Sequence, residues 1–322
     1  MGVLTDDCFS LTTFAYVTCF SSVRYFGTLT FAPGLPEETT LPFADHFDVW
    51  FARYAADGTL QWVRRAGARD RDRPLDSASY PDGSFVLTGM FEGSTRFGEG
   101  EPNETSFDAV DGRELWIARF HADGALDWAY AGVGPGRTEG RSVALLIDGS
   151  VILAVRADGD VTFDEGGPNE TTIPDTGNGQ VKFVRFAADG TLLYAKSDGG
   201  PGNEGMGTVA SFADGSFLGV GSTSGTGVLG VGTPNETSFV SDAEGDLLYA
   251  HYGADGNLRW ACREGGPGDD SARRVATFPD GSFVVLGRSD GGTKTFAKGT
   301  ADETQTDARH LIVGYARVPI VR

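Results

Sequence analysis

Acidic residues recur at corresponding points of successive segments of this chain. Glu139, Glu204 and Asp269 align loosely in steps of about 66 residues, and Asp270 follows directly. Two carboxyl groups held close together can carry out general acid–base catalysis. Acidic oxygens gathered in one turn, as in residues 265–270, can instead bind calcium, which takes six to eight oxygen ligands. These residues are therefore the first candidates for a binding surface, a hydrolase or lyase site, or a calcium site.

Motifs for a specific chemistry are missing from the sequence. The four histidines lack zinc-ligand spacing, and no Gly-x-Ser-x-Gly, phosphate-binding loop or dinucleotide fingerprint occurs. The alternating acidic pattern of a calcium loop is also missing. Residues 133–137 correspond to the turn at 265–270 in an earlier copy, and they carry the positive charge of Arg137 where that turn has an aspartate. The sequence favours a protein without catalytic machinery or cofactor, with calcium as the alternative.

Aromatic and basic residues divide into regular and irregular positions. Trp62, Trp128 and Trp260 recur in successive copies, which predicts that they pack between structural units rather than bind sugars. Trp50 and Trp116 are replaced by other residue types in later copies and are freer to contact a ligand. The candidate binding residues are Arg137, Glu139, Glu204, Asp269, Asp270, Trp50 and Trp116. A second recurring set is expected to pair with turn aspartates: Arg53, Arg119, Arg185 and Arg317, with His251 in the same role.

A strict internal repeat indicates what positions these residues. The period is 66 residues, and its markers are Asp-Gly at 57, 123, 189 and 255 and Asp-Gly-Ser at 82, 148, 214 and 280. Each copy contains four short apolar runs separated by turn signals, as strands are. Asp-Gly between two runs favours a two-residue hairpin turn. Repeated groups of four antiparallel strands predict an all-β protein, a β-propeller.

The ends of the chain predict the number of blades. Four full repeats occupy residues 47–310, and residues 1–46 and 311–322 supply complementary parts of one more. We therefore expect a single domain over residues 1–322, a five-bladed ring closed by pairing of the two terminal segments. Such closure removes the exposed sheet edges of an open array.

Within the predicted blades, two stretches resemble a known family. Phe51-Ala-Arg-Tyr-Ala-Ala-Asp-Gly-Thr-Leu-Gln-Trp62 and Pro81-Asp-Gly-Ser-Phe-Val-Leu-Thr-Gly89 resemble the SBBP-type β-propeller repeats of bacterial secreted proteins. The resemblance covers the chain from about residue 9 onward. It implies a non-catalytic module at the cell surface or outside the cell.

By analogy with such repeats, the strand before each Asp-Gly-Ser is expected to be the innermost of its blade and the tryptophan strand the outermost. Both hairpins then lie at one end of the blade. Two long connections lie at the opposite end: the blade-to-blade loops, such as residues 132–140, and inserts of about 20 residues, such as 93–112. Because loops on a rigid scaffold commonly carry binding residues, we expect the ligand there.

Charge and composition limit the partners. A net charge of −19 predicts repulsion from nucleic acid and anionic membranes, and no apolar run is long enough to insert into a bilayer. Residues 1–25 show no signal-peptide pattern, so we expect that the signal is not part of this chain or that export takes another route. Cys8 and Cys19 can pair or remain free thiols, and Cys262 is expected to be inert.

Together these features predict an extracellular or cell-surface binding or scaffold module. Its expected ligand is a glycan or a protein surface. The alternatives are an enzyme with an acidic site at the mouth of the channel and a structural spacer in a larger assembly.

Overall fold

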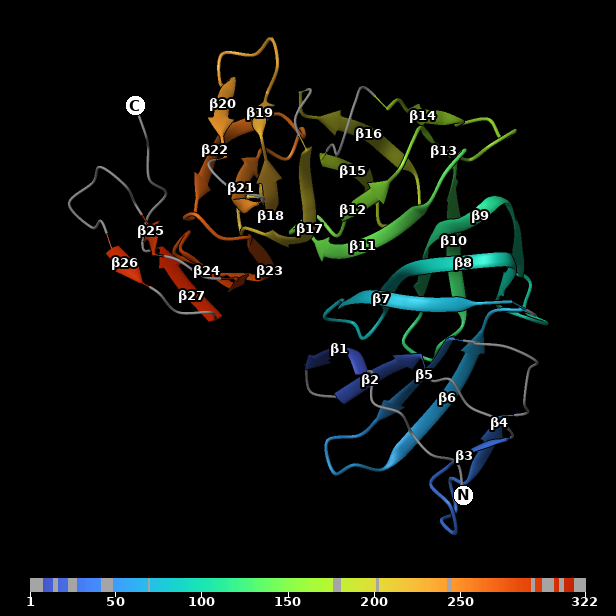
Figure 1. Ribbon diagram of the computed structural model, residues 1–322. Coiled ribbons are helices and arrows are strands. Elements are labelled where there is room, and N and C mark those ends of the chain that lie inside the picture. The colour runs from blue at the N-terminus through green and yellow to red at the C-terminus, as the bar shows by residue number, and fades with distance from the viewer. Residues whose placement is uncertain are drawn as a thin grey trace. The chain divides into compact units, whose positions relative to one another are not determined.

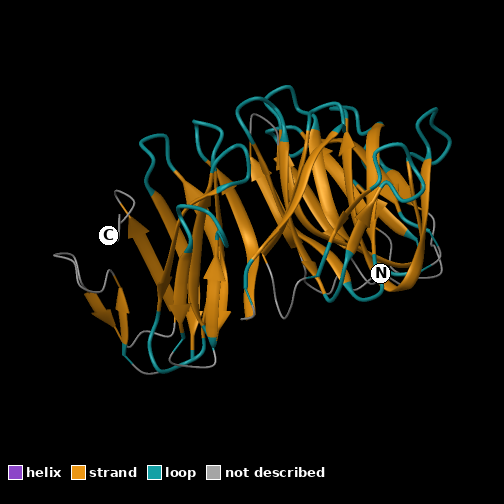
Figure 2. Ribbon diagram, turned by 90° about the horizontal axis from the view of Figure 1, so that it is seen from above, coloured by secondary structure: helices purple, strands orange, loops and turns teal. Residues whose placement is uncertain are grey.

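The computed structural model describes residues 8–13, 17–22, 28–41, 49–68, 70–175, 181–200, 203–241, 245–290, 293–296, 304–306 and 310–315. Every regular element in these ranges is a β-strand, which confirms the predicted all-β class (Figures 1 and 2). The chain divides into two compact units, Met1–Val143 with Gly159–Thr172 and Ala144–Asp158 with Ile173–Arg322. Within the described ranges, no helix has the length and apolar content needed to cross a membrane.

Five antiparallel sheets follow one another along the chain. The first is ordered β1 (Cys8–Thr13), β2 (Val17–Ser22), β5 (Val49–Tyr54), β6 (Leu60–Ala66). The second is β7 (Asp72–Ser79), β8 (Phe85–Phe97), β9 (Thr105–Phe120), β10 (Leu126–Val133), extended by β13 (Val161–Phe163) and β14 (Thr171–Ile173). The third is β11 (Thr138–Leu145), β12 (Val151–Ala157), β15 (Val181–Phe186), β16 (Leu192–Asp198). The fourth is β17 (Asn203–Ser211), β18 (Phe217–Ser224), β21 (Asp246–Tyr252), β22 (Leu258–Glu264), and the fifth is β23 (Asp270–Thr277), β24 (Phe283–Ser289), β27 (His310–Tyr315).

The order of strands in the second to fifth sheets agrees with the sequence prediction. The strand that precedes Asp-Gly-Ser forms one edge, and in the four-stranded repeats the strand that carries Trp62, Trp128, Tyr194 or Trp260 comes fourth. Second strands such as β8 are buried on both faces from Phe85 to Phe91, because neighbouring layers cover them. Their Val, Leu and Phe side chains suit such a doubly covered strand.

The terminal segments pair differently from the predicted shared blade. β1 and β2 join β5 and β6 in one sheet, and β27 pairs with β24. Each terminal segment therefore completes a sheet with its own sequence neighbours among the described residues. The second to fifth sheets each begin at the strand before Asp-Gly-Ser. The repeats counted from residue 47 instead begin two strands earlier in the pattern. The last part of the predicted closing segment, residues 316–322, lies outside the described residues.

The Asp-Gly turns are one residue longer than predicted. Gly58 N donates to Ala55 O at 2.9 Å, and Ala55 N donates to Thr59 O at 2.8 Å, which closes a three-residue loop. Gly58 has φ 86°, whereas Asp57 is not among the described residues with positive φ. A two-residue type I′ turn needs positive φ at both positions, so this is a type I turn followed by a left-handed glycine and a bulge. The strand register shifts at the same point, between Arg53 and Tyr54.

The inserts contain hairpin ribbons instead of the long free loops that we expected. Examples outside the five sheets are β3 (Leu29–Phe31) with β4 (Thr39–Leu41), β19 (Thr226–Leu229) with β20 (Thr237–Val240), and β25 (Lys294–Phe296) with β26 (Thr304–Thr306) (Figure 1). In the Pro-Asn-Glu-Thr turn of β19–β20, Asn235 Nδ2 donates to Leu258 O at 2.9 Å and Glu236 Oε2 accepts from Gly232 N at 2.7 Å. Leu258 begins β22, the fourth strand of the fourth sheet, so the tip of the ribbon packs back onto its own sheet.

This contact predicts a measurable contribution of the insert to stability. Asn235→Ala removes one amide hydrogen bond and is expected to lower the free energy of unfolding by about 1 kcal/mol. Asn169 occupies the same place in another insert, where its backbone N donates to Asp164 but its side chain is in none of the described hydrogen bonds, so Asn169→Ala should change stability by less than about 0.5 kcal/mol. Urea denaturation of both variants provides the measurement. Equal effects of the two substitutions would show that the amide of Asn235 does not anchor the ribbon.

Two of the three recurring tryptophans, Trp62 and Trp260, pack between sheets, as predicted. The Trp62 ring stacks on Phe85 of the second sheet with ring centroids 6.1 Å apart, and Trp62 Nε1 donates to Ala122 O at 3.2 Å. Trp260 stacks on Phe283 of the fifth sheet at 6.2 Å. The predicted ion pair forms at one basic position, where Arg185 Nη2 donates to the turn carboxylate of Asp148 at 2.6 Å. Arg119 pairs instead with Asp127 on β10, and Arg317 lies outside the described residues. These side chains are structural.

Candidate functional site

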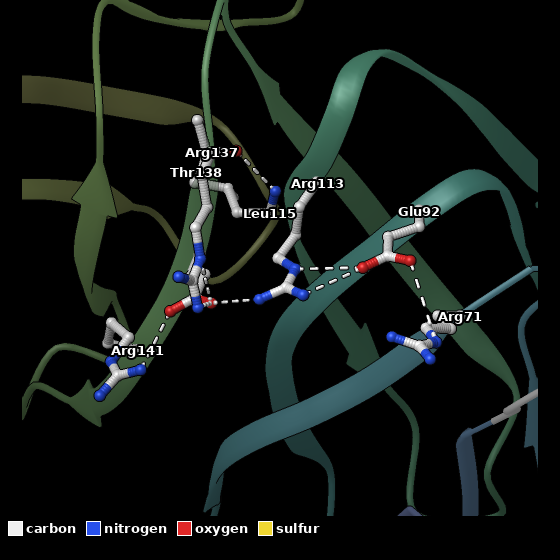
Figure 3. Close-up of polar contacts among 8 residues, drawn as sticks. Arg71, Glu92, Arg113, Leu115, Arg137, Thr138 and Arg141 are labelled. Carbon is white, nitrogen blue, oxygen red and sulfur yellow. Dashed lines mark hydrogen bonds and ion pairs between the residues drawn. The ribbon is translucent and has the colours of Figure 1, made fainter.

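A cluster of four arginines and two glutamates gathers at the end of the strands opposite the Asp-Gly turns. We call it the arginine cluster; its members are Arg71, Glu92, Arg113, Arg137, Glu139 and Arg141 (Figure 3). Arg71 precedes β7, Glu92 lies on β8, Arg113 on β9, and Glu139 and Arg141 on β11. All six belong to the first compact unit.

Arg113 links the two glutamates. Its Nη2 lies 3.0 Å from Glu92 Oε1, and its Nη1 lies 3.4 Å from Glu139 Oε1. The register makes the first contact possible, since Glu92 and Arg113 are direct cross-strand partners. Thr138, directly before Glu139, helps to position the second contact, between Arg113 and Glu139. Its buried hydroxyl accepts a hydrogen bond from Leu115 N and donates one to Gly132 O, both at 2.8 Å.

Glu139 receives two further arginines. Arg137 Nη2 approaches Glu139 Oε1 at 2.5 Å, and Arg141 Nη1 approaches Oε2 at 3.0 Å. Burial opposes ionisation of Glu139, but the hydrogen bonds and charges of Arg137 and Arg141 outweigh it and lower the pKa. Glu139 therefore stays ionised and holds the guanidinium groups in place.

The arginine cluster has an excess of positive charge in an acidic protein. Four guanidinium groups surround two carboxylates, although the whole chain has a net charge of −19. The side chain of Glu139 is 4% exposed, whereas Arg137 and Arg141 are 39% and 35% exposed. An anionic group from solution can reach these arginines, and planar guanidinium groups suit carboxylate and sulfate oxygens.

Two of the predicted binding residues, Arg137 and Glu139, lie together in this cluster. The other four members were not predicted. Arg71 is one period before Arg137, which is a usable signal, but the position corresponding to Arg113 is glycine at 179 and 245. Only the pairing of β8 with β9 and the start of β11 bring these residues together.

The predicted ligand-binding tryptophans are buried. Trp116 has 0% exposure and Trp50 has 8%, and each lies in a hydrophobic core cluster. Trp116 Nε1 donates to Met90 O at 3.1 Å, and the Trp50 ring meets Phe31 with centroids 4.9 Å apart. A ligand at the surface would not reach these rings, so the structure gives both a packing role.

The three carboxylates proposed for catalysis have unlike surroundings. Glu139 is ion-paired, Asp269 is exposed, and Glu204 has no exposed surface. Neither carboxylate oxygen of Glu204 has a hydrogen-bond partner. Burial raises the pKa of Glu204 to about 7, the charge of Asp198 adds to the rise, and nearby backbone amides only partly oppose it. Glu204 has the pKa of a general acid or base but no surface that a substrate could contact.

No metal centre of the usual kind is present in the described ranges, where no three His, Cys, Asp or Glu side chains converge. Asp270 is fully buried at the start of β23. Burial raises the pKa of Cys262 to about 12, with the charge of Glu264 adding to the rise, so its thiol is unreactive near neutral pH, as predicted. The strands of Cys8 and Cys19 are described, but their side chains lie outside the described structure.

Comparison with known proteins gives one informative similarity. The chain is 30% identical over 204 residues to the regulatory protein FlaEY of Caulobacter vibrioides. The match covers 61% of this chain, which spans only 21% of the length of that protein. No protein-family model matches the chain.

Proposed function

We propose that the chain is a non-catalytic binding module, a five-bladed β-propeller that holds an anionic ligand at the arginine cluster. Five successive sheets with the same strand order support the propeller. The single observation that carries the binding role is the set of half-exposed guanidinium groups held by Glu92 and Glu139. Its resemblance to secreted repeat proteins supports a place at the cell surface or outside the cell.

The ligand is a glycan or protein surface that presents one or two separate carboxylate or sulfate groups. A dense polyanion such as nucleic acid fits poorly, because the net charge of −19 repels it at distances beyond the cluster. A single anionic group interacts mainly with the nearest arginines, Arg137 and Arg141, which Glu139 holds close to one another. Glu92 and Glu139 fix the orientation of the guanidinium groups before binding, which lowers the entropic cost of binding an anion.

The geometry favours binding over catalysis. General acid catalysis needs a proton near neutral pH, and the lowered pKa of Glu139 removes it. The similarity to part of a much longer regulatory protein supports a module that contributes binding within a larger chain. Regulation itself is a statement about that relative, and we propose only the binding role for this chain.

A glycan array and a set of short acidic peptides test the proposal. Bound members should carry a carboxylate or sulfate, and affinity should fall as salt rises, because exposed charges are screened. The double variant R137Q/R141Q should lose at least about tenfold in affinity, as expected when charged hydrogen bonds worth roughly 1.5–3 kcal/mol each are removed.

Two control variants are available in the same compact unit. Arg96→Gln removes an equal charge from an exposed arginine that pairs with Glu99 and Glu104 in an insert. Thr59→Glu adds a negative charge at an Asp-Gly turn, at the opposite end of the strands. Both should retain wild-type affinity. Selective binding of neutral glycans, or equal loss in R96Q and R137Q/R141Q, would contradict the arginine cluster as the binding site.

A further inference from the structure

Two sheets of the second compact unit share a buried pair of oxygen-bearing side chains. Glu204 faces Thr223 across the first two strands of the fourth sheet, and Asp270 faces Ser289 at the same place in the fifth. All four are 2% exposed or less. In each pair the hydroxyl and at least one carboxylate oxygen have no hydrogen-bond partner. Buried polar atoms are rarely left without a partner, so a repeated pair calls for an explanation.

A second carboxylate joins the pair in the fifth sheet. Asp246 begins β21, is completely buried, and has an unpartnered Oδ1. The backbone brings it beside Asp270, because Asp270 N donates to Gly245 O at 2.8 Å. Both acids point to the space beside Gly265, where a Cβ atom would lie 2.2 Å from Asp246 Oδ1 and 2.9 Å from Asp270 Oδ2. Glycine at 265 therefore lets both carboxylates approach each other against the backbone, where any side chain would collide with them.

Protein donors satisfy only one oxygen of each carboxylate. Arg263 Nη1 donates to Asp246 Oδ2 at 2.5 Å, and Gly266 N donates to Asp270 Oδ2 at 3.0 Å. Asp246 Oδ1, Asp270 Oδ1 and Ser289 Oγ remain as acceptors. Two carboxylates share a single guanidinium group, so negative charge exceeds positive charge among these side chains. Two like charges at short range in a buried place repel strongly unless something positive lies between them.

We propose that Asp246, Asp270 and Ser289 bind one calcium ion beside Gly265. Calcium is a hard cation that takes carboxylate, hydroxyl, carbonyl and water oxygens in flexible geometry, which matches a set made only of oxygens. Two carboxylates and a hydroxyl supply three ligands, and water and backbone oxygens complete the shell. Magnesium demands near-ideal octahedral geometry and keeps most of its waters, which this buried space does not favour.

Titration of the whole chain, stripped of metal with EDTA, with CaCl2 tests the site by calorimetry and by thermal unfolding. We expect one bound calcium ion with a Kd on the order of 10⁻⁴–10⁻³ M, the range of weak calcium modules, and a Tm that rises with calcium. MgCl2 at equal ionic strength should bind at least about tenfold more weakly. An absence of saturable calcium binding would overturn the proposal, as would equal affinity for magnesium.

Matched variants locate the ion. Asp270→Asn should weaken calcium binding more than about tenfold and, without calcium, should melt no lower than wild type, because it relieves repulsion from Asp246. Ser289→Ala should weaken calcium binding a few-fold, and it tests the site if Asp270→Asn does not fold. Asp290→Asn removes an equal charge from an exposed neighbour and should bind as wild type does. If calcium binding survives both Asp270→Asn and Ser289→Ala, the ion binds elsewhere and the proposal is overturned.

Discussion

Replacing Trp116 with alanine is expected to lower the free energy of unfolding by about 3–5 kcal/mol, as truncation of large buried aromatic residues does. Trp116 is fully buried on β9, with its ring 5.1 Å from that of Phe97. The substitution opens a cavity that the surrounding strands cannot fill, because their backbones are held by cross-strand pairing. It also leaves Met90 O without the indole donor that contacts it at 3.1 Å.

Urea denaturation measures this effect, with two comparison variants. Trp116→Phe keeps much of the ring and loses the N–H group, so a smaller loss of about 1–2 kcal/mol is expected. Leu35→Ala removes an apolar side chain that is 59% exposed and should change stability by less than about 0.5 kcal/mol. If Trp116→Ala proves as stable as Leu35→Ala while binding of a glycan disappears, Trp116 contacts a ligand after all.

Stability should fall between about pH 4.5 and pH 7 because of Glu204. Burial raises the pKa of this residue from 4.5 in the unfolded chain to about 7 in the fold. The folded state therefore favours protonated Glu204, and its contribution is fully present below about pH 4.5. It is lost progressively as the pH rises to about 7 and is absent above that. At 1.36 kcal/mol for each pKa unit, the loss is roughly 3 kcal/mol.

Glu204→Gln isolates this effect. The variant cannot ionise at position 204, so it should be more stable than wild type at pH 8 by roughly 3 kcal/mol and nearly equal to it at pH 4.5. Chemical denaturation at a series of pH values gives both curves. Parallel curves for wild type and variant would show that Glu204 keeps an ordinary pKa in the fold.

The turn aspartates contribute in a separate pH range. Hydrogen bonds from Ser84 and Ser216 lower the pKa values of Asp82 and Asp214 below 3.8. Their contribution is present above about pH 3.8 and is lost only as the pH falls further, so it does not overlap the range of Glu204. Acid unfolding at low pH therefore reports on the turns together with the ion-paired Glu139, whose pKa is also lowered, and the change near neutral pH reports on Glu204.

The sequence alone determined the features that depend on neighbouring residues. Asp-Gly-Ser predicts a turn because the Asp82 side chain bonds the backbone and hydroxyl of Ser84, two positions along the chain, at 2.9 and 2.6 Å. Apolar runs between such turns predict strands, and strict recurrence predicts equivalent sheets. The packing of Trp62 and the ion pair of Arg185 followed because a structural role must repeat wherever the unit repeats.

Only the tertiary structure decided which distant residues meet. The arginine cluster joins Arg71, Glu92, Arg113 and Glu139 from four strand ends, and the acids beside Gly265 come from β21 and β23. Those contacts depend on strand register, on one-residue bulges and on where each sheet begins, and a shift of one residue would turn each side chain to the other face. Burial decided the remaining features. In the sequence Trp116 looks free to contact a ligand and Glu204 looks free to contact a substrate. In the structure, strand layers exclude solvent from Trp116, and burial raises the pKa of Glu204.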